Sequence, residues 1–344
     1  MWSVGRKELW RYCTREHCRD MLLSFQLLGE NGWPEDKEIA CLYALANHSE
    51  RHYEKIRIPK KRGGVRTLLA PDPLLKYVQR NLLNHVLEGR PAADCAAAYR
   101  KRDENSTALC GIVENAAVHA GQPLLMKLDI QDFFGNITFP MVLHHAFPAR
   151  YFPPVVGNLL TALCCYGEYL PQGAPTSPAV SNLVMRPFDE FMQKWCSEQG
   201  VSYSRYCDDM TFSGDFDPKK VRKKAEGFLQ AMGFELNHKK TRVISKAARQ
   251  TVTGLVVNDK AQTSVQFRKS LRQEIYYCRK FGVEDHLKYR QNKEELTKGE
   301  AVHYLQQLLG RVNYVCLTRP EDPWFLEAKK WLKAILVVYL LEIR

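Results

Sequence analysis

The stretch "YSRYCDDMTFSG", residues 203–214, places two adjacent acids in the middle of a run that otherwise reads as strand. Asp208 and Asp209 repel one another, and Asp is a poor strand former. A turn between two short strands would lower that cost, because Asp tolerates turn geometry. A bound metal ion would lower it as well. The pattern therefore predicts a hairpin whose tip presents two carboxylates.

A third acid ends another apolar run, "QPLLMKLDIQDFF" at 122–134, which has the length of a strand up to Asp129. If that strand lies beside the hairpin, three carboxylates converge and repel strongly without cations. Two Mg²⁺ ions about 3.5–4 Å apart are the usual remedy, and Mg²⁺ favours few carboxylates together with substrate phosphates. This arrangement predicts nucleotidyl transfer, in which a 3′-hydroxyl attacks a triphosphate. An isolated Asp at a strand end is usually a turn residue or a helix cap, and for Asp129 taken alone that alternative is favoured.

The bulk properties indicate a soluble, basic protein. The chain has 344 residues, which is more than one core usually serves. Lys and Arg number 50 against 38 Asp and Glu, which leaves a net charge of +12. This excess points to an acidic partner, of which nucleic acid is the commonest large example. A basic protein without such a partner would have the same composition.

Other classes of protein are disfavoured. The eleven cysteines lack the spacing of zinc sites or of a disulfide framework, which favours reduced thiols in a cytoplasm. The first residues, "MWSVGRKELW", lack the apolar core of a signal peptide. The longest apolar run, "AILVVYLL" at 334–341, is too short to span a bilayer. We therefore expect a cytoplasmic protein without a membrane partner.

Periodicity along the chain predicts strands interleaved with helices, followed by a basic helical tail. Alternation in "YEKIRIPKKRGGVRTLLAP", 53–71, indicates a hairpin with a basic tip, and Asp217 and Gly233 bound a predicted helix. Short strands are expected at "FEL", "RVIS" and "TVTGLVV". The predicted fold is α+β, with a helical extension over 1–50, a catalytic body over 51–260 and a helical domain over 261–344.

Four segments in register resemble a known family. "YCDD" at 206–209 resembles the Tyr-x-Asp-Asp box of reverse transcriptases, and "DIQDFF" at 129–134 resembles their first aspartate motif. "LPQGAPTSPAVSN" at 170–182 and "GFELNHKKT" at 233–241 fall where two further motifs belong. "NAAVH" at 115–119 and "VTG" at 252–254 are similar to elements of bacterial retron reverse transcriptases. The resemblance covers roughly residues 50 to 315.

The resemblance implies a right-hand polymerase, with fingers and palm in 51–260 and an RNA-binding thumb in 261–344. It makes Asp129, Asp208 and Asp209 the ligands of two Mg²⁺ ions, together with the carbonyl of Ile130. Lys240 falls where the family has a lysine near the leaving pyrophosphate, as a general acid. Lys239 is its rival, and a pair of surface lysines is the structural alternative.

The resemblance also assigns the nucleotide site. Phe134 would crowd a ribose 2′-hydroxyl, and the triphosphate and base would contact Lys60, Lys61, Arg66, Gln172 and Gly173. Arg grips phosphate in a bidentate manner, whereas Lys acts as a point charge. The structural alternatives are a solvated basic turn, core aromatics at 133 and 134, and a loop glycine.

A second set of residues is expected to contact RNA, which proteins read by shape, backbone and unpaired loops. The spacing of Asn115 and His119 predicts that they share one helix face. A core histidine with a polar cap is an equal alternative, and a solvated helix face is the alternative for the tail. The full set is Asn115, His119, Val252, Thr253, Gly254, Arg268 and Arg272.

The function implied is reverse transcription of a cognate structured noncoding RNA into a branched, RNA-linked single-stranded DNA in antiphage defence. The partners implied are that RNA and its DNA product, dNTPs, a separate effector protein and host RNase H. Alternatives are another prokaryotic reverse transcriptase (group II intron-like, diversity-generating or abortive-infection type) and a viral RNA-copying polymerase. A non-catalytic RNA-binding scaffold is the alternative from a different class.

Overall fold

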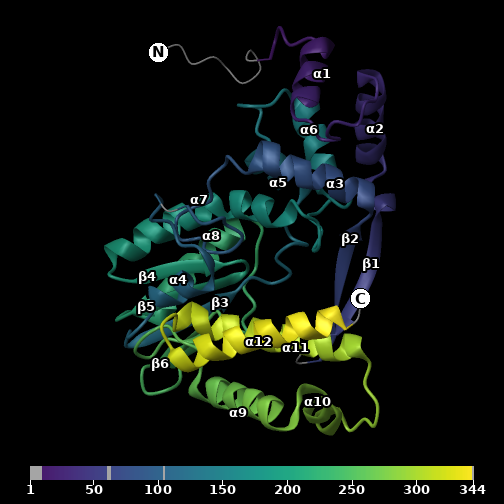
Figure 1. Ribbon diagram of the computed structural model, residues 1–344. Coiled ribbons are helices and arrows are strands. Elements are labelled where there is room, and N and C mark those ends of the chain that lie inside the picture. The colour runs from purple at the N-terminus through teal and green to yellow at the C-terminus, as the bar shows by residue number, and fades with distance from the viewer. Residues whose placement is uncertain (1–9, 60–62, 104, 343–344) are drawn as a thin grey trace. The chain divides into compact units, whose positions relative to one another are not determined.

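The computed structural model describes residues 10–59, 63–103 and 105–342 (Figure 1). The chain forms two compact units. The first comprises Met1–Cys110, Met126–Phe212 and Phe216–Val243, and the second comprises Gly111–Leu125, Ser213–Asp215 and Ile244–Arg344. Two short internal segments, Gly111–Leu125 and Ser213–Asp215, thus belong with the C-terminal part of the chain, and the domain limits near residues 50 and 260 stay predictions.

The first unit opens with helices. Thr14 caps α1 (Arg15–Ser24) through its side chain, and acids in the first turn favour α2 (Glu35–Asn47). Both helices pack against α6 (Pro154–Cys164). The short helix η1 (Ser49–His52) then leads into the sheet region.

A two-stranded antiparallel hairpin follows, visible as a long ribbon in Figure 1. Strand β1 (Tyr53–Pro59) pairs with β2 (Val65–Pro71), so that Tyr53 faces Pro71 and Pro59 faces Val65. Asp72 then caps α3 (Pro73–Leu82), which continues as the π-helical turn η2 (Leu83–Leu87). The predicted hairpin is therefore confirmed.

A four-stranded sheet carries the acidic motifs. Its strands are β3 (Leu124–Asp129), β4 (Ser202–Tyr206), β5 (Asp209–Gly214) and β6 (Arg242–Ser245), in the order β4-β5-β3-β6. The strand expected at "FEL" is absent. Leu236 makes only an isolated bridge to Ile130. Ile130 lies just past the end of β3, so the pairing is limited to this single pair of residues.

Helix α7 (Ser177–Glu198) anchors the core of this unit and packs on β4, α5 (Phe139–Ala146) and α8 (Pro218–Ala231). Val180, Val184, Phe188 and Met192 recur every four residues on one face and are fully buried. Burying each such side chain stabilises the fold by about 1.5–3 kcal/mol. Asp217 caps α8 by accepting a hydrogen bond from the backbone of Lys219, as predicted.

The second unit combines a small β-module with a helical group. The module joins α4 (Gly111–Ala117) to the hairpin of β7 (Thr251–Val252) and β8 (Leu255–Val256). The helices are α9 (Val265–Phe281), α10 (Val283–Gln291), α11 (Lys298–Thr318) and α12 (Pro323–Leu341), with α11 and α12 side by side (Figure 1). The predicted α+β class is therefore confirmed. Over the described residues, no helix combines the length and apolar character that crossing a bilayer requires.

Candidate active site

The two adjacent acids lie at the tip of a tight hairpin. Strand β4 ends at Tyr206, Cys207 and Asp208 form the turn, and Asp209 begins β5. Cys207 has a φ of 60°, a left-handed conformation for which glycine is the usual residue. Cysteine pays about 1–2 kcal/mol for it. The turn is thus strained at the residue before the paired carboxylates.

Strand β3 lies directly beside this hairpin. It neighbours β5 in the sheet, and the backbone N–H of Ile130 donates to the carbonyl of Asp208 at 3.1 Å. Asp129 ends β3, so its carboxylate is at the same end of the sheet as Asp208 and Asp209. The predicted adjacency of the two acidic sites is therefore present in the structure.

Asp129 is 7% exposed and has a cationic partner. Lys240 Nζ donates to both carboxylate oxygens of Asp129, at 2.8 and 2.9 Å. Burial raises the pKa of Asp129, the hydrogen bond from Lys240 opposes that shift, and the charge of Asp208 adds to it. Lys240 thus sits at the acidic end of the sheet, where it balances the charge of Asp129.

The pKa of Asp209 depends on the neighbouring acids. Burial raises the pKa of Asp209, and the charges of Asp208 and Asp129 raise it further, against the opposing effect of Lys127. Within the described ranges, no three His, Cys, Asp or Glu side chains are already arranged to hold one metal ion. The available donors are carboxylate oxygens and the carbonyl of Ile130, and an all-oxygen set fits a hard divalent cation.

These groups form the floor of a cleft of about 1110 Å³ that lies within the first unit. The cleft wall includes the hairpin β1–β2, the loop after β3 and the segment before α7. Eight of the predicted site residues line it: Arg66, Asp129, Ile130, Phe134, Gln172, Asp208, Asp209 and Lys240. Lys60 and Lys61 lie outside the described residues.

The cleft also contains groups that the sequence reading missed. Lys55 and Arg57 line it from β1, and Asp132, Asn237 and Tyr99 line it elsewhere. The alternation of "YEKIRIP" placed Lys55 and Arg57 on one face of β1 and could have identified them. Tyr99 carried no such signal, because no strand or helix pattern surrounds it.

Phe133 and Phe134 divide the two expected roles between them. Phe133 is 4% exposed and packs edge-to-face on Phe134, with ring centroids 5.3 Å apart, and against Phe234. Both rings line the cleft, and the half-buried Phe134 is the more exposed of the two. Phe133 is therefore mainly a core residue, as expected for one of the pair, and Phe134 is the one that a nucleotide sugar could contact more freely.

Gly173 is needed for a different contact from the one expected. Its φ is 130°, and a Cβ atom there would lie 2.7 Å from the carbonyl oxygen of Leu69 in β2. The neighbouring Gln172 carbonyl accepts a hydrogen bond from the Leu69 N–H at 2.8 Å. Gly173 does not line the cleft among the described residues. The close approach is thus to the hairpin backbone, which Gly173 ties to the loop before α7.

Several residues expected to bind RNA are buried in the second unit. Helix α4 ends at Ala117, so His119 lies beyond it and the shared helix face was wrong. Asn115, His119 and Val252 are at most 1% exposed, and His119 Nδ1 lies 2.7 Å from Ser213 Oγ. Their burial favours the core reading over direct contact with RNA.

The "VTG" segment forms the tip of the hairpin β7–β8. Thr253 and Gly254 have φ values of 45° and 84°, as a type I′ turn requires. Thr253 Oγ1 donates to the carbonyl of Ile112 at 2.8 Å, so this tip packs on the segment that carries Asn115. The two elements similar to those of retron enzymes therefore meet in one module, and Gly254 is exposed at the tip of its hairpin.

The two tail arginines also differ. Arg268 is 8% exposed, and its guanidinium donates to the carbonyl of Thr263, so it braces the start of α9 and is not a surface cation. Arg272 is exposed, stacks over the ring of Trp324 at 5.4 Å and pairs with Asp322. Arg272 remains a candidate phosphate contact.

Comparison with known proteins gives the family. Residues 58–305 match the model of the family "Reverse transcriptase (RNA-dependent DNA polymerase)". The retron Mx65 reverse transcriptase of Myxococcus xanthus is 34% identical over 69% of this chain and 58% of its own length. The retron Ec86 and Ec83 reverse transcriptases of Escherichia coli are 30% and 31% identical, over 67% and 64% of this chain.

This chain spans 70% and 73% of those two relatives. The matched region includes the turn between β4 and β5, the four-stranded sheet and every acid of the cleft floor. The chain therefore belongs to the reverse transcriptases, and within them to the bacterial retron type.

Proposed function

We propose that this protein is an active RNA-directed DNA polymerase that adds deoxynucleotides to a 3′ end paired with RNA. The observation that carries this proposal is the convergence of Asp129, Asp208 and Asp209 on the floor of a cleft walled by cationic residues. A scaffold that only bound RNA would gain nothing from holding three repelling carboxylates together.

The cleft residues divide the chemistry among them. Asp129, Asp208, Asp209 and the carbonyl of Ile130 would hold two Mg²⁺ ions, which activate the attacking hydroxyl and neutralise the triphosphate. Arg66, Lys55 and Arg57 bind the phosphates from the hairpin β1–β2. Phe134 packs against the sugar and disfavours a 2′-hydroxyl. Lys240 stands beside Asp129, within reach of a leaving pyrophosphate.

We further propose that the template is a cognate structured noncoding RNA. Synthesis would start from a 2′-hydroxyl of that RNA and leave a branched RNA–DNA molecule in the bacterial cytoplasm, in antiphage defence with a separate effector and host RNase H. Support comes from relatives that are named retron reverse transcriptases, and from the "NAAVH" and "VTG" elements that pack together in the second unit.

The test is synthesis by the protein co-expressed with the RNA encoded beside its gene. Given dNTPs and Mg²⁺, the wild type should yield DNA covalently joined to RNA, seen as a band that shortens with RNase. Asp208→Asn should abolish the product and keep RNA binding. Asp215→Asn removes the same charge from an exposed position outside the cleft and should behave as the wild type. Equal synthesis by Asp208→Asn would contradict the assignment.

A further inference from the structure

A charged residue is fully buried directly behind the acidic turn. Arg205 lies in β4, is 0% exposed and has one of the largest side chains enclosed in the protein. Burial lowers the pKa of a guanidinium, but the carboxylate of Asp189 more than offsets that effect and keeps Arg205 charged. Such a residue needs partners for all of its N–H groups, or its burial would cost several kcal/mol.

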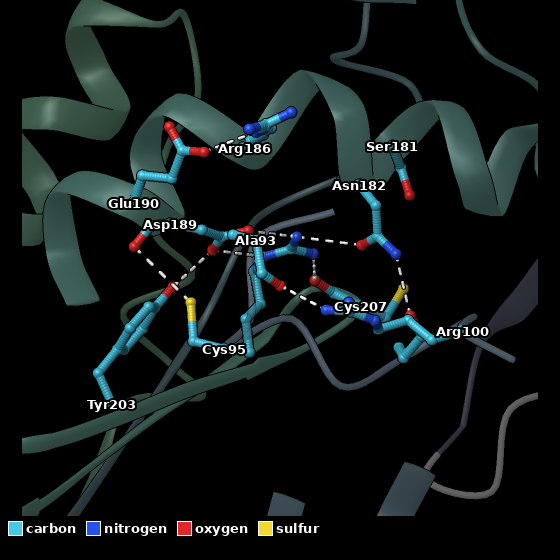
Figure 2. Close-up of polar contacts among 12 residues, drawn as sticks. Ala93, Cys95, Arg100, Ser181, Asn182, Arg186, Asp189, Glu190, Tyr203 and Cys207 are labelled. Atoms are coloured by element: carbon cyan, nitrogen blue, oxygen red, sulfur yellow. Dashed lines mark hydrogen bonds and ion pairs between the residues drawn. The ribbon is translucent and has the colours of Figure 1, made fainter. Parts of the chain in front are cut away.

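The carboxylate partner comes from α7. Arg205 Nε donates to both oxygens of Asp189 at 2.9 and 3.1 Å, and Nη2 donates to Oδ2 at 2.6 Å. Asp189 is also 0% exposed and accepts a further bond from the hydroxyl of Tyr203 at 2.9 Å. Figure 2 shows Asp189 on the helix with Tyr203 reaching it from the strand below. The pair is bidentate and closed to solvent.

The remaining guanidinium contacts reach the catalytic hairpin. Nη1 donates to the carbonyl of Cys207 at 2.8 Å, and Nη2 donates to Oδ1 of Asn182 at 3.1 Å. Figure 2 shows Asn182 and Cys207 on the same side of this cluster. Because Cys207 holds the positive φ of the turn, Arg205 bonds the residue at which this turn is strained.

The same cluster fixes a second strand of chain beside the turn. The N–H of Arg205 donates to the carbonyl of Cys95, and the N–H of Ala97 donates to the carbonyl of Arg205, both at 2.9 Å. Asn182 Nδ2 donates to the carbonyl of Ala98 at 2.9 Å. This segment ends at Tyr99, whose hydroxyl donates to Cys207 Sγ at 3.1 Å within the cleft. The turn is thus held by its carbonyl and by its side chain.

Stability alone is a poor reason for this arrangement. Replacing a buried ion pair with well-packed apolar side chains is often neutral or stabilising. A guanidinium offers what an apolar group cannot, which is a rigid fork that bonds a carboxylate, an amide and a turn carbonyl at once. These contacts fix the direction in which the peptide after Cys207 points, and Asp208 follows at the next residue.

We propose that Arg205, held by Asp189 and Asn182, is a positioning residue that sets the left-handed turn at Cys207 and thereby the placement of the Asp208 and Asp209 carboxylates. The inference rests on the polymerase activity proposed above for its effect on rate. It also predicts that variants which lose the contacts of Arg205 bind divalent cations more weakly, and this binding can be measured without catalysis.

The test compares Arg205→Lys with a matched control, Tyr203→Phe. Lysine keeps the charge beside Asp189 but cannot also reach Asn182 and the Cys207 carbonyl. Tyr203→Phe removes one hydrogen bond from the same Asp189 and leaves the turn contacts intact. Binding of Mn²⁺ is followed by electron paramagnetic resonance, and DNA synthesis on a primed RNA template is followed against Mg²⁺ concentration. Both run at a temperature where tryptophan fluorescence shows each variant folded.

For Arg205→Lys we expect Mn²⁺ affinity to fall at least threefold, kcat to fall at least tenfold and the half-saturating Mg²⁺ concentration to rise, with RNA affinity unchanged. For Tyr203→Phe, the Mn²⁺ affinity, the kcat, the half-saturating Mg²⁺ concentration and the RNA affinity should all stay within twofold of the wild-type values. If Arg205→Lys does not fold, Asn182→Ala retains the ion pair and should show the same changes at about twofold or more.

The outcomes are distinguishable. If Arg205→Lys has the same Mn²⁺ affinity and rate as Tyr203→Phe, the positioning role is overturned. Where Arg205→Lys does not fold, the same result for Asn182→Ala overturns it. A wild type that makes no DNA, with Mn²⁺ binding still weakened by Arg205→Lys, would refute the proposed polymerase and leave the positioning role standing.

Discussion

Gly173→Ala should loosen the contact between the loop before α7 and the hairpin β1–β2. The added Cβ atom would lie 2.7 Å from the carbonyl oxygen of Leu69, closer than real side chains come, and the φ of 130° is one that alanine rarely adopts. The atoms nearest to this Cβ position all belong to the backbone of Leu69, and none of them is part of a flexible side chain that could move away. The backbone of β2 or of the loop must therefore move.

Two contributions determine how much Gly173→Ala lowers the free energy of unfolding. A residue held in a disfavoured backbone region costs about 1–3 kcal/mol. Displacing the loop also weakens the 2.8 Å hydrogen bond from Leu69 to the carbonyl of Gln172, which is worth about 1 kcal/mol. The free energy of unfolding should fall by about 3 kcal/mol, which corresponds to a Tm lower by about 6–12 °C at the 2–4 °C per kcal/mol typical of domains of about 150–250 residues.

Gly200→Ala provides the matched control. Gly200 also has a positive φ, 67°, but nothing lies within 4 Å of the Cβ position. Its substitution carries backbone strain alone, about 1–2 kcal/mol, partly offset by the reduced freedom of the unfolded chain. We expect a loss of about 1 kcal/mol and a Tm lower by about 2–4 °C.

Two assays separate the variants. Thermal unfolding by circular dichroism gives the Tm of each, and steady-state kinetics on a primed RNA template gives KM for a dNTP. Because Gln172 lines the cleft, Gly173→Ala should raise KM, whereas Gly200→Ala should not. A Tm loss for Gly173→Ala no larger than that for Gly200→Ala, with KM unchanged, would refute the close-approach argument.

Two further predictions concern single side chains. Phe134→Ala should relax the rejection of ribonucleotides because it opens the cleft beside the sugar. An unchanged ratio of kcat/KM for dNTP and rNTP would contradict the role of Phe134 in excluding the 2′-hydroxyl. Burial lowers the pKa of His119 to about 3, so only the unfolded state takes up a proton as the pH falls below about 6.5. Urea unfolding should therefore show stability falling by about 1.4 kcal/mol per pH unit from there towards pH 3, and His119→Gln should flatten this dependence; parallel curves would show that another group causes it.

The acidic floor was predictable because its determinants are local. Each acid ends or begins a short strand, and strands of this length with turn residues between them have few ways to pair. Asp129 and Asp208 are far apart in sequence, yet a single assumption of strand adjacency joined them. The same reasoning placed the cap Asp217 and the hairpin β1–β2, since capping and alternation need only nearby residues.

The sequence could not reveal which polar residues are buried, because the residues that enclose them are far away along the chain. Arg205 reads as a surface or phosphate-binding residue until Asp189 and Asn182 on α7 are seen to enclose it. His119 was assigned to RNA by resemblance and Arg268 by the basic charge of the tail helix, and tertiary packing placed both inside the second unit. A motif shared with a family indicates that a residue is needed, and only packing decides whether it contacts the ligand or supports the residues that do.

The charge of the cleft argues for the number of cations that the proposed reaction uses. Among the described residues that line it, the four acids Asp129, Asp132, Asp208 and Asp209 face the four cations Lys55, Arg57, Arg66 and Lys240, so the lining is neutral without substrate. A nucleoside triphosphate brings about four negative charges, and two divalent cations restore neutrality where one would leave about two in excess. Lys240 is already committed to Asp129, so its charge does not replace the second ion. DNA synthesis should therefore rise with more than the first power of Mg²⁺ concentration below saturation, and strictly first-power dependence would contradict the two-ion site.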